Sequence, residues 1–326
     1  MLSQHTGDLE NLETMQVFEE TLEHMKRFFR VKPEAVAYDL HPRYLSTRYA
    51  MAMEGVRKIG IQHHHAHIAS CMAENRLEGS VIGVALDGTG YGTDGKIWGG
   101  ELLVCDFSGF ERAYHFRYVP LAGGDAAVRQ PWRSALAYAK DAGLDAEFLR
   151  ERIAPDSLQV ADRMIVRGVN TVDSSSCGRL FDAVSALLGL RLEANYEGQA
   201  AMELEAAAHD VDKPYPFEIN GGEVDLRETI RSVARDRQRP GIASGRFHLT
   251  LAHVVTEGAR RMRAADHLNR VCLSGGSFQN LLLLRQTIEL LQSEGFEVYT
   301  HALVPPNDGG LSLGQAVCAN RMLLSL

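Results

Sequence analysis

Four histidines within five residues are the densest chemical signal in the sequence: His63, His64, His65 and His67. They stand at the opening of a predicted helix, where residues i and i+4 share a face, so His63 and His67 can bind one metal ion. The same geometry turns His64 and His65 towards substrate or solvent. Residue 64 is not glutamate, so the general base of a His-Glu-x-x-His metalloprotease is missing. The alternative interpretation is a polar helix start whose histidines only cap or pack.

A metal held by two histidines needs further ligands, and Asp308 is the best candidate. It lies in the segment Pro-Pro-Asn-Asp-Gly-Gly at 305–310, between a strand-like stretch and the last predicted helix. Spacing alone favours a helix N-cap role for Asn307 or Asp308. Two imidazoles and one carboxylate with open positions suit iron(II), zinc or manganese, and the sequence does not choose among these metals.

Two glycine clusters follow predicted strands and are candidate phosphate-binding loops. The stretch Asp87-Gly88-Thr89-Gly90 ends a buried-looking strand and is longer than a turn requires, so a phosphate cradle is preferred over a hairpin turn. The Asp-Gly pair at 94–95 is the hairpin signal. In the second cluster, Gly275 and Gly276 join a strand to a helix, whose free N–H groups favour an anion. Asn280 follows, either as a ligand to base or ribose or as a first-turn polar residue.

Three further residues open predicted helices. Gly178 and Asp182 lie in Gly-Arg-Leu-Phe-Asp, where Asp182 either accepts ribose hydroxyls or is a first-turn acid favoured by the helix dipole. Gly198 permits a close approach of the backbone to a ligand. None of the glycine clusters has the P-loop pattern or Gly-x-Gly-x-x-Gly, so neither a P-loop protein nor a dinucleotide fold is expected.

The elements that position these residues alternate between helix and strand, which predicts an α/β fold. Helices are expected where apolar residues recur at helical spacing, over Met15–Phe29, His65–Asn75, Ser134–Ala142, Arg179–Leu188, Leu249–Met262, Gln279–Ser293 and Gly310–Met322. Strands are expected at short apolar runs, over Ala35–Tyr38, Val81–Leu86, Glu101–Asp106, Arg270–Leu273 and Phe296–Thr300. Glycine clusters from two separate parts of the chain suggest a nucleotide held between two lobes.

Composition excludes several classes of protein. With 326 residues, of which 45% are hydrophobic, the chain can build a large core, and its net charge of -8 argues against a nucleic-acid partner. Five scattered cysteines exclude a fully paired disulfide framework and a zinc ribbon, and fit a reducing compartment. No apolar run is long enough to span a membrane, and no signal peptide is evident. A cytoplasmic protein is therefore expected.

Taken together and in order, these motifs resemble the C-terminal transferase region of HypF, the carbamoyltransferase of [NiFe]-hydrogenase maturation. The resemblance begins in the segment at 3–11 and runs to the C-terminus. It is carried by the segments His63–Cys71, Ala85–Gly92, Gly178–Ala183, Tyr196–Glu203, Ser274–Asn280 and Asn307–Gln315.

The resemblance implies a two-lobed actin/Hsp70-like ATPase fold, shared with the tRNA threonylcarbamoyl-transferase TsaD and with antibiotic O-carbamoyltransferases. Residues 1–326 then form one TsaD-like domain, with lobes at 1–78 plus 301–326 and at 79–300. The first β-hairpin of the N-terminal lobe is expected to be missing. The acylphosphatase-like, zinc-finger and YrdC-like domains of a full HypF are not in this sequence either, which puts adenylate formation by this chain in doubt.

The resemblance also assigns roles to the candidate residues. His63, His67 and Asp308 become the ligands of a divalent metal, iron or zinc, beside an adenylate. The loops Asp87–Gly90 and Gly275–Gly276 face phosphate. The nucleoside site is lined by Asp182, Gly198 and Asn280, and Gly178 is a further nucleotide-binding residue.

Family members make carbamoyl adenylate from carbamoyl phosphate and ATP, for which Mg²⁺ is a further candidate ion, and carbamoylate the C-terminal cysteine of HypE. The resemblance therefore implies carbamoyl transfer from the adenylate to a HypE-like acceptor, with release of AMP. Three alternatives stay open: a small-molecule O-carbamoyltransferase, a non-catalytic nucleotide-binding scaffold, and a sugar-kinase-like ATPase, which the histidine cluster disfavours.

Overall fold

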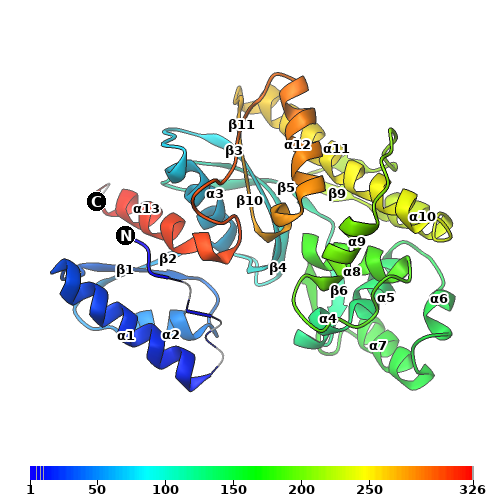
Figure 1. Ribbon diagram of the computed structural model, residues 1–326, viewed down its shortest axis with the longest axis horizontal. Helices are drawn as coiled ribbons and strands as arrows, with labels where there is room; N and C mark the ends of the chain where they lie inside the picture. The colour runs from blue at the N-terminus through cyan, green and yellow to red at the C-terminus, as the bar shows by residue number, and fades with distance from the viewer. Residues whose placement is uncertain (5, 8, 10, 325–326) are drawn as a thin grey trace.

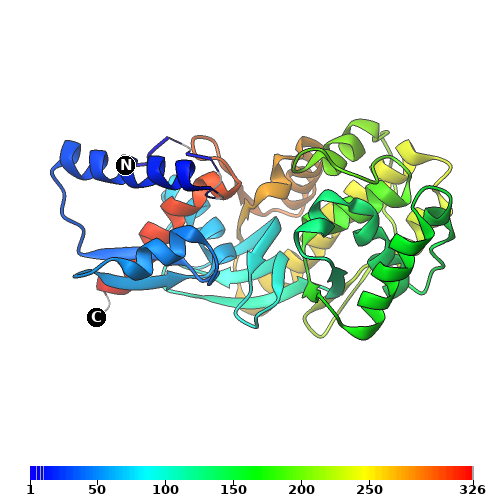
Figure 2. The ribbon, with the colours of Figure 1, turned by 90° about the horizontal axis from the view of Figure 1, so that it is seen from below.

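The computed structural model describes residues 1–4, 6–7, 9 and 11–324, so positions 5, 8 and 10 of the segment where the family resemblance begins lie outside it. The molecule is elongated, and its two chain ends lie on the same side (Figures 1 and 2). Strands and helices alternate along the chain, which confirms the predicted α/β class.

The strands form one small and one large sheet. In the small sheet, β1 (Ala35–Asp39) and β2 (Arg57–Ile61) pair in parallel. The strands of the large sheet are β3 (Val81–Tyr91), β4 (Ile97–Cys105), β5 (Phe110–Phe116), β6 (Val119–Ala122), β7 (Thr171–Ser174), β8 (Glu218–Asn220), β9 (Glu223–Asp225), β10 (Arg270–Ser274) and β11 (Glu297–Tyr299). Their order is β11-β10-β3-β4-β5-β9-β8, and β6 and β7 pair with each other beside β4.

The helices divide between the two ends of the molecule (Figure 1). Near the small sheet lie α1 (Leu12–Phe29), α2 (Leu45–Ala52), α3 (His63–Glu74) and α13 (Leu311–Leu324). The remainder are α4 (Asp125–Arg129), α5 (Pro131–Asp141), α6 (Glu147–Arg150), α7 (Pro155–Arg167), α8 (Cys177–Leu187), α9 (Gln199–Ala207), α10 (Arg227–Arg235), α11 (Pro240–Asp266) and α12 (Leu281–Ser293). Two short 3-10 helices, η1 (Gly276–Gln279) and η2 (Asp308–Gly310), complete the set that the structure describes.

Strand β3 is buried on both faces, which explains why its sequence is a continuous apolar run rather than an alternating one. Ile82, Val84 and Leu86 belong to the large core, which includes side chains from α5, α8 and α11. Val81 and Ala85 point to the opposite face and pack with apolar residues of α3. Packing against the central strand therefore fixes the position of α3 on the sheet.

Helix α13 packs closely on α3 and also contacts β1 and β2. Gly314 makes this approach possible, because a Cβ atom at this position would lie 1.8 Å from the carbonyl oxygen of Ala66. Within the described part of residues 1–78, β1 and β2 are the only strands, so no leading antiparallel hairpin is seen there. No described helix combines the length and the apolar character that crossing a membrane requires.

Candidate functional site

Helix α3 presents the two histidines that the sequence pairs. The side chain of Gln62 caps this helix by accepting a hydrogen bond from the amide of His65, so helical geometry already holds at His63. The rings of His63 and His67 therefore lie on one face, with their centroids 5.0 Å apart. Both side chains are buried, at 0% and 1% exposure.

Two carboxylates from distant segments meet this pair of rings. The Nε2 atom of His63 lies 3.3 Å from Asp87 Oδ2 and 3.6 Å from Asp308 Oδ1. The Nε2 atom of His67 lies 3.6 Å and 3.5 Å from the same two oxygens. One donor atom from each of the four residues falls within 4.8 Å of all the others. The structure thus brings together His63, His67 and Asp308, and adds Asp87.

Asp39, at the end of β1, orients the first histidine. Its Oδ2 lies 2.8 Å from His63 Nδ1, and since a carboxylate only accepts, the Nδ1–H group donates. In its neutral form, as a metal ligand requires, His63 therefore has its lone pair on Nε2, which faces Asp87 and Asp308. Sequence analysis did not single out Asp39, although an acid directly after the predicted strand Ala35–Tyr38 was a usable signal.

The histidines and carboxylates of the cluster shift one another's pKa values. Burial lowers the pKa of His63, but the three surrounding carboxylates outweigh it and raise that pKa well above its usual value. Burial also lowers the pKa of His67, but the carboxylates of Asp308 and Asp87 outweigh burial, so the pKa of His67 is raised as well. Conversely, the histidines hold the pKa of Asp87 and of Asp308 below its usual range, against the effect of burial. Each group therefore favours its charged form because the opposite charge is close.

The residues present fit a divalent metal. Two imidazole nitrogens and two carboxylate oxygens from four separate side chains are a common donor set for zinc and for iron(II). Within the described part of the chain, His67 Nε2 is buried without a hydrogen-bond partner, as expected of a ligand atom. Asp308 keeps 64% of its side chain exposed, so the cluster is open on one side.

Asp308 is free to face the histidines because its neighbour, Asn307, caps the helix instead. Asn307 is the N-cap of η2, and its Oδ1 accepts a hydrogen bond from the amide of Gly309. The cap role that spacing left open between the two residues thus belongs to Asn307. Helix α13 begins directly after η2, so its packing on α3 carries Asp308 towards the histidines.

The stretch Asp87–Gly90 is not the terminal loop that the sequence predicted. It lies inside β3, which continues to Tyr91, and the pairing with β4 shifts register between Leu86 and Gly90. The strand continues because the Asp-Gly turn at 94–95 closes the hairpin later; Gly95 has φ +78°. At Gly90 a Cβ atom would lie 2.4 Å from the ring of His64, so this glycine makes room for the histidines.

The loop Gly275–Gly276 predicted at phosphate and the predicted nucleotide-binding residue Gly178 lie around the same bulge. Gly276 donates its N–H to Asp87 Oδ1 at 2.9 Å, which ties η1 to β3. Gly275 has φ +102° and packs so closely that a Cβ atom would lie 2.2 Å from the carbonyl of Leu86. Gly178, at the start of α8, approaches Gly88, where a Cβ atom would lie 2.9 Å from the Gly88 Cα. Thr89, next along β3, is exposed.

The residues predicted at the nucleoside lie on neighbouring helices. Asp182 of α8 is buried, 3.0 Å from Arg179 Nε, and burial raises its pKa to about 6 even though Arg179 opposes the shift. Gly198 precedes α9 with φ +75° and open space where a Cβ atom would stand. Asn280 is the N-cap of α12, and its Nδ2 lies 2.9 Å from His248 Nε2. Helices α8 and α9 contact each other, and η1 contacts α8 and β3.

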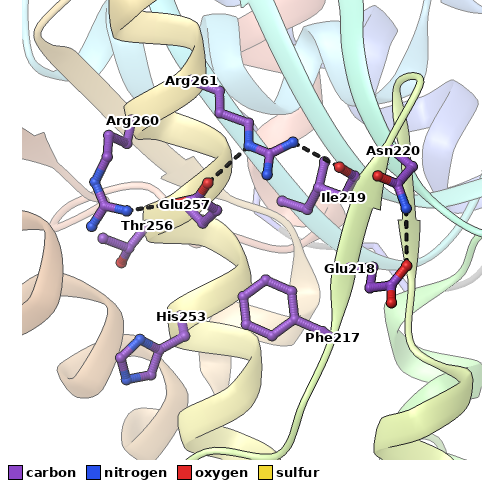
Figure 3. A pocket seen from close by; sticks show the side chains of 9 residues that line it. All are labelled: Phe217, Glu218, Ile219, Asn220, His253, Thr256, Glu257, Arg260 and Arg261. Carbon is purple, nitrogen blue, oxygen red and sulfur yellow. Dashed lines mark hydrogen bonds and ion pairs between the residues drawn. The ribbon is translucent and has the colours of Figure 1, made fainter.

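A separate cavity of about 420 Å³ lies between β8 and α11, away from the cluster (Figure 3). Its charged residues bind one another: Glu257 bridges Arg260 and Arg261, and Arg261 also donates to the carbonyl of Ile219. None of the predicted site residues lines this cavity, so it is not part of the proposed metal and nucleotide site.

Two family models and a solved structure match nearly the whole chain. Residues 83–315 match the family "Carbamoyltransferase, Kae1-like domain, second subdomain", and residues 1–74 match the HypF Kae1-like domain. A crystal structure of full-length HypF in its phosphate- and nucleotide-bound form superposes with a TM-score of 0.94 at 45% identity, over 98% of this chain and 52% of that one.

Two relatives show how far the similarity extends. The carbamoyltransferase HypF of Rhodobacter capsulatus is 39% identical over 100% of this chain and 44% of its own length. A carbamoyltransferase HypF homolog of Cupriavidus necator is 36% identical over 97% of this chain and 85% of its own length. The chain spans less than half the length of several curated relatives that it matches. It belongs to the HypF carbamoyltransferase family and corresponds to the Kae1-like region of that family.

Proposed function

We propose that this chain transfers a carbamoyl group from carbamoyl adenylate to the C-terminal cysteine thiol of a HypE-like acceptor. The single observation that carries the proposal is the convergence of His63, His67, Asp87 and Asp308 from three separate segments of a carbamoyltransferase-family chain. Carbamoyl adenylate is formed in this scheme from carbamoyl phosphate and ATP, and AMP is the product released.

In this proposal, the four clustered side chains hold iron or zinc. When bound, the metal supplies Lewis-acid stabilisation of negative charge on the donor. The segments Asp87–Gly90 and Gly275–Gly276 face the phosphate, and Asp182, Gly198 and Asn280 line the nucleoside. Asp39 fixes the ring of His63 so that its Nε2 lone pair stays directed at the cluster.

The nucleotide-bound structure of the HypF relative supports the nucleotide site of this proposal. The acceptor is inferred from family membership, and an O-carbamoyltransferase acting on a sugar hydroxyl is the outcome to be distinguished from it. Localisation in the cytoplasm belongs to the same proposal, because five free cysteines fit a reducing compartment.

Metal analysis tests the cluster. Elemental analysis of purified protein is expected to find about one bound metal per chain, and the double variant His63→Ala, His67→Ala is expected to lose it. His24→Ala is the matched control, because His24 is an exposed histidine on α1. Unchanged metal content in the double variant would refute the proposed ligands.

Carbamoyl transfer is tested separately. The chain is mixed with carbamoyl adenylate and a synthetic peptide that ends in cysteine, and mass spectrometry follows the peptide. A carbamoylated thiol supports the proposal, whereas labelling of a sugar hydroxyl and not of the peptide indicates an O-carbamoyltransferase. If the chain binds AMP in calorimetry but labels neither acceptor, the non-catalytic scaffold alternative is supported, and failure to bind AMP or ATP contradicts the nucleotide site.

A further inference from the structure

Gln62 fixes the hydrogen-bonding state of the histidine two residues later. Its Oε1 accepts from the amide of His65 at 2.9 Å, and its Nε2 donates to the carbonyl of Tyr91 at 3.2 Å. These two backbone partners determine which end of the amide is the donor. The same Nε2 lies 3.2 Å from His64 Nδ1. Because Nε2 of an amide only donates, His64 Nδ1 must accept.

The proton of His64 is therefore on Nε2. This Nε2–H group is buried and has no hydrogen-bond partner in the part of the chain that the structure describes. The whole side chain is 0% exposed. An unpaired buried donor costs about 1–3 kcal/mol and calls for an explanation such as a missing ligand. An Nε2 that carries a proton also has no lone pair for a metal, so His64 is not a further ligand through that atom.

The ring of His64 adjoins the metal cluster. Its centroid lies 5.2 Å from that of His63 and 6.4 Å from that of His67. The bulge in β3 opens the space for it, since a Cβ atom on Gly90 would lie 2.4 Å from His64 Cε1. Trp98 of β4 borders the ring at 6.2 Å between centroids. The ring that carries this hydrogen-bond donor thus lies next to both histidines of the proposed metal site.

We propose that His64 donates its Nε2–H to the carbamoyl oxygen of the donor as negative charge develops there. This inference rests on the proposed function and adds a catalytic residue to it. A preorganised neutral donor in a buried site stabilises such an oxyanion without needing to rearrange during the reaction.

The step balances without any further reactant. The acceptor thiol loses its proton to solvent, and its sulfur forms a bond to the carbamoyl carbon. The electron pair of the C=O bond moves to the oxygen, which accepts the hydrogen bond from His64. When the C=O bond re-forms, the bond between carbon and the phosphate oxygen breaks, and AMP leaves with that electron pair. His64 keeps its proton throughout.

The tautomer is tested without any activity assay. In ¹⁵N spectra of histidine-labelled protein, the His64 signals are identified by their loss in His64→Phe. They are expected to show a protonated Nε2 and an unprotonated Nδ1. In Gln62→Glu the carboxylate can only accept, so the proton is expected to move to Nδ1. A protonated Nδ1 in the unsubstituted protein would overturn the inference.

Kinetics test the role in transfer to the cysteine peptide. His64→Phe is expected to lower kcat about 100-fold, with metal content and AMP affinity unchanged, because removing one oxyanion donor has an effect of about this size. His64→Gln retains an N–H donor and is expected to recover part of the rate. Gln62→Glu keeps the imidazole but reverses its tautomer, and is expected to be as slow as His64→Phe.

The control and the outcomes separate the two proposals. His115→Phe makes the same change on β5, where Nδ1 is satisfied by the carbonyl of Phe116, and it is expected to leave the rate unchanged. If the unsubstituted chain transfers and His64→Phe transfers equally fast, the His64 inference is wrong and the proposed function stands. If the unsubstituted chain binds metal and AMP but transfers nothing, the proposed function itself fails.

Discussion

At the scale of single residues, the metal cluster depends on a residue that touches only one ligand. The 2.8 Å contact from Asp39 to His63 Nδ1 sets both the tautomer and the ring orientation of that ligand. Residues that orient metal ligands in this way influence metal affinity even though they do not contact the ion.

Asp39→Asn is therefore expected to weaken metal binding about 10- to 100-fold, the usual effect of losing such a partner. The variant keeps the size of the side chain but replaces a charged acceptor by a neutral amide. Competition with a metal-sensitive dye measures the affinity. His41 also lies next to this strand end, where Asp39 Oδ1 accepts from its amide, so circular dichroism should verify that the fold is retained. An affinity equal to that of the unsubstituted chain would contradict the orienting role.

The sequence predicts the histidine pair and Asp308 but not the complete cluster. His63 and His67 are local, one helical turn apart, so spacing alone suffices. Asp87 was expected at phosphate, because nothing in the order of residues shows that a register shift in β3 turns its carboxylate to the histidines. Asp39 depends on the parallel pairing of β1 with β2, which was outside the prediction because β2 was not recognised.

A second residue-scale prediction concerns His248, which supports Asn280. Burial lowers its pKa from 6.5 to about 4, and its two nitrogens contact the carbonyl of Ser244 and the amide of Asn280. Since the unfolded chain binds the proton more readily, stability is complete above pH 6.5. It falls as the pH decreases from 6.5 towards 4, by at most about 3 kcal/mol.

His248→Gln retains a donor and an acceptor but does not titrate. Urea unfolding at pH 7.5 and pH 4.5 is expected to show a smaller loss of unfolding free energy for this variant than for the unsubstituted chain. Both proteins losing the same free energy would show that other groups account for the acid sensitivity.

At the scale of elements, glycines such as Gly314 allow helices and strands to pack closely. Every predicted helix and strand overlaps an observed one, and α3 begins two residues earlier than expected because Gln62 caps it. The elements that the sequence did not predict include β2, β5, the short strands β6 to β9, and polar-surfaced helices such as α7 and α10. Strands of three or four residues carry too little periodicity to be distinguished from loops, and their pairing is decided by neighbours that are distant in sequence.

The contact between α13 and α3 is expected to control the metal cluster from a distance. Gly314→Val places a branched side chain where even a Cβ atom would lie 1.8 Å from the Ala66 carbonyl. The helices must separate, at a cost of about 1–3 kcal/mol or more, and Asp308 moves with α13. The melting temperature, measured by thermal unfolding, and the metal affinity, measured by titration, should therefore both decrease.

Gly109→Val is the matched control for that substitution. Gly109 lies in the turn between β4 and β5, with open space where a Cβ atom would stand and no positive φ. It is expected to retain nearly all of the stability and the full metal affinity. If Gly314→Val lowers stability but leaves metal affinity unchanged, then η2 positions Asp308 independently of α13.

At the scale of the whole molecule, the metal would connect three segments that are far apart in the chain. His63 and His67 come from α3, Asp87 comes from β3, and Asp308 comes from η2, near the C-terminus. In the unfolded chain these groups are dispersed, so a metal at this site binds the folded state far better. Folding stability should then depend on metal concentration by mass action.

Zinc is therefore expected to raise the free energy of unfolding of the metal-stripped protein, by about 2.7 kcal/mol when the free metal is at 100 times its dissociation constant. Urea titrations with and without zinc measure this difference. The double variant His63→Ala, His67→Ala should show none of it, whereas His24→Ala should show all of it. The five cysteines are buried in the folded chain and become accessible on unfolding, so any binding of zinc to thiols favours the unfolded state and lowers stability. A rise of equal size in the double variant would therefore place the ion at another folded site, and the four-residue cluster would lose its proposed role.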